Sequence, residues 1–126
     1  MIFKNETHAE QWAEAVEAAG AVRDDDTVSG YYGASLFIIT GIPGLYSRVK
    51  QHIHNSWVDY EAMLGMGLST GESVLVALAG NFYNGGFFDR YTPDDIVAHC
   101  DAGMVELAAK ALWLRKQRID INTIFE

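Results

Sequence analysis

The segment from Leu68 to Gly86, LSTGESVLVALAGNFYNGG, constrains the fold of this chain more than any other part of the sequence. It begins with Ser69 and Glu72 in the S-x-x-E spacing of a capping box, which satisfies free N–H groups at a helix start. Apolar residues then recur at helical spacing, and the pair Gly85–Gly86 is typical of a helix end. The segment therefore predicts a helix that organises the core and has a polar, aromatic end.

Similar start and stop signals predict the remaining helices. We expect helices from Asn5 to about Ala19, from Ser29 or Gly30 to Gly41, from Pro43 at the first helical position to about Ile53, from Asp59 to Gly65 or Gly67, from Thr92 to about Cys100, and from Asp101 to about Arg118. The run Leu36–Ile39 alone also fits a strand, but its surroundings have helical length. A helix that is apolar nearly all round is expected at the centre of the fold.

Together these signals predict an all-α fold, a single-domain bundle of about six or seven helices with short connections. The chain has 126 residues, which is the length of one domain, so residues 1–126 are expected to form one helical domain. Its 49% hydrophobic and 21% charged residues are ordinary values for a globular protein. Residues 119–126 fit either a short strand or an ordered C-terminal extension.

The net charge of −8 makes direct binding to nucleic acid unfavourable, because affinity for phosphates comes from lysine and arginine. The charge is unevenly distributed: residues 1–30 are acidic and residues 110–118 are basic, so the two regions could attract within one chain or between copies. No apolar run has the length of a membrane span, and the N-terminus turns polar at once. The single cysteine, Cys100, fits a reducing compartment. We therefore expect a cytoplasmic protein without a membrane partner.

Several motifs suggest chemistry only weakly. The glycine-rich stretch Gly65–Gly71 lacks the preceding strand of a dinucleotide-binding loop, so it is interpreted as the approach to a helix. His52 and His54 are two residues apart and would point away from each other on a helix. Asp95 and His99 can face each other at i, i+4, whereas Cys100 points away and is interpreted as a buried structural thiol. No catalytic residue, metal or cofactor is expected.

Polar and aromatic groups gather around the predicted helix end at Gly85–Gly86. Asn81, Tyr83 and Asn84 precede it, and Asp89-Arg90-Tyr91 follows it. These groups could bind a ligand or a partner backbone. They could equally serve the fold, because asparagine can satisfy loose carbonyl groups and tyrosine can bury its ring. The candidate binding residues are Asn81, Tyr83, Asn84, Asp95 and His99.

The chain resembles an uncharacterised family of short, helical, bacterial and phage-associated proteins of unknown function. The likeness extends over most of the chain and is carried by Met1–His8, Ile42–Tyr46 with Val49, Ser69–Glu72, Ala79–Gly85, Thr92–Ile96 and the C-terminal helix. The resemblance implies a small cytosolic protein that is often encoded near mobile elements. It implies no activity, cofactor or catalytic residue.

Three functional hypotheses follow. The first is a non-enzymatic interaction protein that self-associates as a homodimer, because the predicted C-terminal helix has a wide apolar surface. The second is a small-ligand binder or enzyme with a pocket near Asn81–Gly86. The third is an acidic regulator from a phage or mobile element that binds a basic protein.

Overall fold

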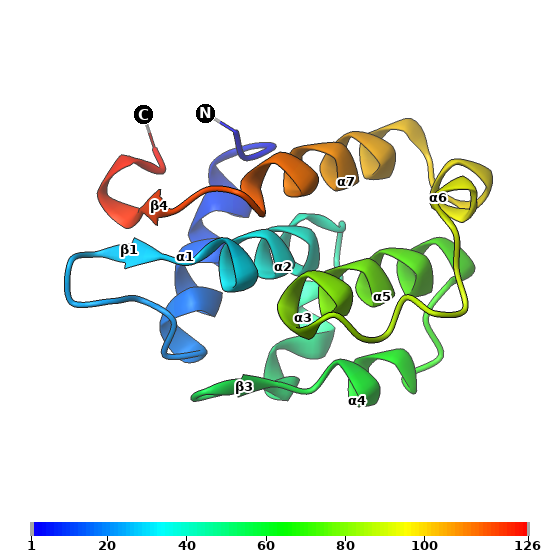
Figure 1. Ribbon diagram of the computed structural model, residues 1–126, viewed down its shortest axis with the longest axis horizontal. Coiled ribbons are helices and arrows are strands. Elements are labelled where there is room, and N and C mark those ends of the chain that lie inside the picture. Colours follow the sequence, from blue (N-terminus) through cyan, green and yellow to red (C-terminus); the bar gives the residue numbers. More distant parts are fainter. Residues whose placement is uncertain (1, 126) are drawn as a thin grey trace.

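The computed structural model describes residues 2–125 of the chain as a mostly helical fold with two small antiparallel sheets (Figure 1). In chain order its elements are α1 (Glu6–Ala18), β1 (Thr27–Val28), α2 (Gly30–Gly41), α3 (Tyr46–Val49), the 3-10 helix η1 (Lys50–His52), β2 (Ile53–His54), β3 (Trp57–Val58), α4 (Tyr60–Leu64), α5 (Thr70–Asn84), α6 (Pro93–His99), α7 (Ala102–Leu114), β4 (Ile119–Asp120) and the 3-10 helix η2 (Ile121–Thr123). The helical prediction is confirmed, but the all-α class is too narrow because strands are present.

Helix α2 lies at the centre of the fold and packs against α1, α5 and α7 (Figure 1). All but two of its residues are buried, so the expectation of a central helix is confirmed. The stretch Leu36–Ile39 is helical, and its alternative as a strand was wrong. The indole N–H of Trp12 on α1 donates to the carbonyl oxygen of Gly33 at 3.0 Å, which fixes α1 against α2.

Small residues on α2 allow the chain that follows α7 to approach its backbone. A Cβ added to Gly30 would lie 2.8 Å from the carbonyl carbon of Arg115, and one added to Gly33 would lie 2.8 Å from Cδ1 of Ile119. Real Cβ atoms essentially never come so close to other heavy atoms. Space therefore requires glycine at position 30, where the neighbouring atoms are backbone, whereas at position 33 the end of the Ile119 side chain would have to shift.

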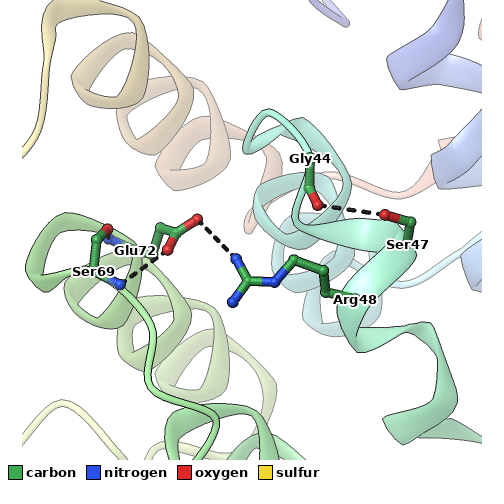
Figure 2. Close-up of polar contacts among 5 residues, drawn as sticks. All are labelled: Gly44, Ser47, Arg48, Ser69 and Glu72. Carbon is green, nitrogen blue, oxygen red and sulfur yellow. Dashed lines mark hydrogen bonds and ion pairs between the residues drawn. The ribbon is translucent and has the colours of Figure 1, made fainter.

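The capping box predicted at Ser69 and Glu72 is present and also joins two helices (Figure 2). Oε1 of Glu72 accepts a hydrogen bond from the Ser69 backbone N–H at 2.9 Å, and the Ser69 hydroxyl accepts one from the Glu72 N–H at 3.2 Å. The other carboxylate oxygen lies 3.7 Å from Nη1 of Arg48 on α3. Such a partly exposed ion pair contributes about 0–1 kcal/mol, so its main effect is to orient α3 against the start of α5.

The helix predicted from Pro43 to Ile53 is shorter than expected. Gly44 has φ +73°, a left-handed conformation that no helix contains, so the α-helical part begins only at Tyr46. After η1 the chain forms the β2–β3 hairpin, in which the His54 ring stacks on Trp57 at 4.7 Å. The placement of Pro43 at the first helical position was therefore wrong.

The C-terminal segment is ordered and pairs with an acidic loop far away in the sequence. Strand β4 runs antiparallel to β1, with Val28 opposite Ile119. Arg118 lies 4.0 Å from Asp25, and the Asn122 side chain donates to the Asp26 carboxylate at 3.1 Å. The C-terminal segment thus contains both a strand and an ordered extension, and one contact between acidic and basic regions occurs within the chain. Glu126 lies outside the described residues.

Helix α7 ends at Leu114 instead of Arg118, because a tight turn at Trp113–Gln117 directs the chain past Gly30 towards β4. Within residues 2–125, no helix is long and apolar enough to cross a membrane.

The substitution Gly30→Ala should lower the free energy of unfolding by about 2 kcal/mol, because the added methyl group overlaps the Arg115 backbone. Urea unfolding followed by circular dichroism measures the change. Gly103→Ala in the first turn of α7 is the matched control, since its Cβ would be in ordinary contact at 3.4 Å, and it should be neutral or slightly stabilising. Equal stability of the two variants would show that the approach of α7 to α2 does not require glycine.

Candidate functional site

The five candidate residues lie at two separate places. Asn81, Tyr83 and Asn84 are at the C-terminal end of α5, whereas α6, which carries Asp95 and His99, packs near the other end of α5 (Figure 1). The Cys100 thiol, next to His99, donates to the carbonyl oxygen of Gly71 at 3.7 Å. Ten residues of α-helix, about 15 Å, separate Gly71 from Asn81. The structure therefore does not bring the five residues together into one site.

The polar groups at the end of α5 serve the helix terminus. Gly85 takes the left-handed conformation, with φ +82°, and its N–H donates to the carbonyl oxygen of Asn81 at 2.8 Å. The side-chain oxygen of Asn84 accepts a hydrogen bond from the Gly86 N–H at 2.9 Å. These hydrogen bonds show that the helix end uses polar groups for the fold, which was the alternative to ligand binding at these residues.

Arg115 satisfies a carbonyl group at the same end of α5, and no sequence pattern predicts this contact. Its Nε donates to the carbonyl oxygen of Phe82 at 3.1 Å, and its guanidinium carbon lies 3.6 Å from the centre of the Tyr31 ring. A cation at a helix C-terminus is favoured by the helix dipole, and one over an aromatic ring gains a cation–π interaction. Arg115 therefore connects the segment after α7 to α5 and α2.

Tyr83 belongs to an aromatic cluster formed with Tyr32 and Tyr60. Its ring centre lies 5.3 Å from that of Tyr32 and 5.4 Å from that of Tyr60. The Tyr60 hydroxyl is buried and hydrogen-bonded to the hydroxyl of Ser35. Burial raises the pKa of Tyr60 well above its ordinary value and the pKa of Tyr32 to about 12, so both remain neutral. The cluster is suited to packing rather than to proton transfer at neutral pH.

Asp95 and His99 face each other across one turn of α6, as their spacing predicts. One oxygen of Asp95 lies 3.9 Å from Nε2 of His99, while the other accepts a hydrogen bond from the Thr92 N–H at 2.7 Å in the helix cap. Burial raises the pKa of the Cys100 thiol, which disfavours the reactive thiolate. Within the described residues, no group of three or more His, Cys, Asp or Glu side chains could hold a metal ion.

His8 is a buried polar residue whose role the sequence did not indicate. Its Nδ1 accepts a hydrogen bond from the Lys4 backbone N–H at 3.1 Å, so Nε2 carries the proton and donates to the carbonyl oxygen of Phe37 at 2.9 Å. A protonated imidazole would place an N–H against the N–H of Lys4. Desolvation, which is the largest cause, lowers the pKa of His8 from 6.5 to about 4. His8 is therefore a neutral connector between α1 and α2.

Four pockets with volumes of about 300 to 450 Å³ lie on the described surface, and none of these four is lined by Asn81, Tyr83 or Asn84. One of about 360 Å³ lies close to the predicted region, under the loop that follows α5. We call it the loop pocket. Its lining consists of Glu61, Leu64, Ser73, Phe87, Asp89, Arg90 and Tyr91. The Asp89-Arg90-Tyr91 part of the predicted cluster thus borders a cavity.

Comparison of the chain with family models, curated proteins and solved structures found no match. The resemblance to a phage-associated family of unknown function therefore stays a prediction.

The neutral state of His8 should make the fold less stable in mild acid. The unfolded chain binds a proton at this imidazole below pH 6.5, whereas the folded chain does so only near pH 4, so stability falls as the pH drops between these values. We expect a loss of about 2 kcal/mol from this group after allowing for partial screening by solvent. Above pH 6.5 the contribution is fully present.

Urea unfolding of the natural protein and of His8→Gln, each at pH 7 and pH 5, isolates this effect. The glutamine amide can replace both hydrogen bonds but does not titrate, and every carboxylate is shared by the two proteins. The variant should therefore lose less stability between the two pH values. Parallel losses in both proteins would show that His8 is not responsible.

Proposed function

We propose that this chain is a small, cytoplasmic, non-enzymatic interaction protein that works as a homodimer, and that the dimer forms through the outer face of α7. The observation that carries the proposal is an apolar stripe on this face. It consists of Ala102, Val105, Ala109, Leu112 and Trp113, which we call the α7 stripe.

The spacing of the α7 stripe is that of a helix–helix seam. Ala102, Val105, Ala109 and Leu112 follow each other at alternating intervals of three and four residues, as the a and d positions of a heptad do. Leu112 is 56% exposed and Trp113 is 59% exposed. The opposite face of α7 is buried against α2 and the core. Helix α7 therefore has two apolar faces, and among residues 2–125 only the inner one is covered.

A second copy of the same helix is the best partner for this stripe. When two α7 helices run antiparallel, the charges at their ends are opposite and small side chains lie next to large ones. Asp101 precedes the helix and exposed Lys116 follows it, so antiparallel pairing brings each acidic start near the basic end of the partner. The alanines at 102 and 109 leave room for close approach of the backbones, while Leu112 and Trp113 supply apolar area.

A second candidate function is supported by the acidic face of α1. Glu6, Glu10, Glu14 and Glu17 are all exposed on this helix. Such a row of carboxylates would suit a basic protein partner, as in the hypothesis of an acidic regulator from a phage or mobile element. An affinity pull-down that recovers a basic protein from the natural chain, and loses it after Glu10→Gln and Glu14→Gln, would favour this function.

Substitution of Leu112 by serine should weaken the dimer about tenfold or more, because it removes roughly 1.5–3 kcal/mol of apolar burial per side chain at most. Sedimentation velocity over a range of protein concentrations measures the monomer–dimer equilibrium. Val97→Ser on α6 is the control, since Val97 is an even more exposed apolar residue outside the α7 stripe. At protein concentrations below the dissociation constant of the dimer, both variants should have the unfolding temperature of the natural protein.

The antiparallel arrangement has its own test. Lys116→Glu should weaken the dimer by repelling the partner's acidic helix start, whereas the same change at exposed Lys50 on η1 should not. A natural protein that sediments as a monomer at all accessible concentrations would overturn the proposal. A dimer insensitive to Leu112→Ser would place the interface elsewhere.

A further inference from the structure

We propose that the loop pocket binds a small organic cation, that is, an ammonium or guanidinium group carried on a short apolar chain. The pocket lies between α4, α5 and the connection from α5 to α6, which Figure 1 shows running back along α5 after Gly86. It shares no residue with the α7 stripe, so this inference is independent of the proposed dimer.

The wall formed by Phe87 is held firmly in place. Phe87 has φ +72°, a left-handed conformation that bulky residues rarely adopt. Its ring packs directly on α5, where a Cβ at Gly80 would lie 2.7 Å from Cδ2 of the ring. On another side the ring centre lies 5.9 Å from that of Tyr60. The cost of the strained backbone is offset by this packing, so the pocket is preformed rather than a gap under a loose loop.

The carboxylates at the pocket are available to a ligand. Glu61 lies on α4 and Asp89 lies in the loop, and both are exposed. Neither takes part in the ion pairs or side-chain hydrogen bonds found among residues 2–125. Arg90 is the one basic residue in the lining, so the pocket carries a net negative charge. A cation entering it gains attraction, which the overall charge of −8 strengthens.

The remaining lining selects an organic cation over a metal ion. The lining includes Phe87 and Tyr91, whose aromatic rings are of the kind that binds cations, and Leu64, which adds apolar surface for a hydrocarbon chain. Among residues 2–125, no group of three or more His, Cys, Asp or Glu side chains could hold a metal ion, and aromatic and apolar lining offers nothing to a hydrated metal ion. The volume of about 360 Å³ is in the range of small-ligand sites. A guanidinium or ammonium group on a short chain matches all these features.

A pair of probes of equal shape tests this proposal. We would titrate n-butylguanidinium and its neutral isostere n-butylurea into the 15N-labelled natural protein at constant ionic strength. The guanidinium should bind with a dissociation constant of about 1 mM and shift the amide signals of Phe87–Tyr91. The urea should bind at least about tenfold more weakly, because it lacks the charge.

Substitutions distinguish binding in the loop pocket from non-specific attraction of the cation to the acidic surface. Glu61→Gln and Asp89→Asn together should weaken guanidinium binding about tenfold or more, whereas Glu10→Gln at an exposed position of α1 should leave it unchanged. Thermal unfolding checks that the exposed substitutions leave the fold intact. Equal binding of the urea, shifts spread over all acidic surfaces, or no shift at Phe87–Tyr91 would each overturn the proposal.

Discussion

The structure depends on the burial of α2, in which every residue except Tyr31 and Tyr32 is buried. A helix that is apolar nearly all round is stable in water only if neighbours cover most of its surface, so α1, α5, α7 and the segment after α7 are all arranged around it. The covering residues also meet its polar groups: Trp12 donates to Gly33, His8 donates to Phe37, and Tyr60 bonds to Ser35. Because these partners lie on α1 and α4, α2 fixes the positions of these two helices relative to each other.

Much of this fold could be predicted from local sequence signals, because helix caps act over only a few residues. Asn5, Ser29, Asp59 and Ser69 each accept the hydrogen bond that their position predicts. The pairing of β1 with β4 could not be predicted, since two-residue strands have no periodicity and their partner lies at the opposite end of the chain. The same holds for Arg115 and His8, whose bonds to Phe82 and Phe37 exist only after tertiary packing.

The candidate site shows that local sequence signals do not predict how helices are placed relative to each other. Helical spacing correctly indicated that Asp95 faces His99. It gave no information on which end of α5 would receive α6, so grouping these residues with Asn81 and Asn84 joined two separate places. Asn84 and Asp95 are hydrogen-bonded to the backbone near their own helix ends, as short polar side chains at helix ends commonly are. Asp89, which makes no such local bond among residues 2–125, borders the loop pocket.

The two proposed surfaces share a physical property that separates them from the core. The α7 stripe lies on the outer side of a helix whose inner side packs on α2, and the loop pocket lies between α4, α5 and the loop that follows α5. The residues proposed for recognition therefore differ from the core residues that stabilise the fold. Leu114 is buried while Leu112, two residues earlier, is exposed. A substitution on the outer set removes little buried area, so a change in binding without a change in unfolding is evidence for recognition at that surface.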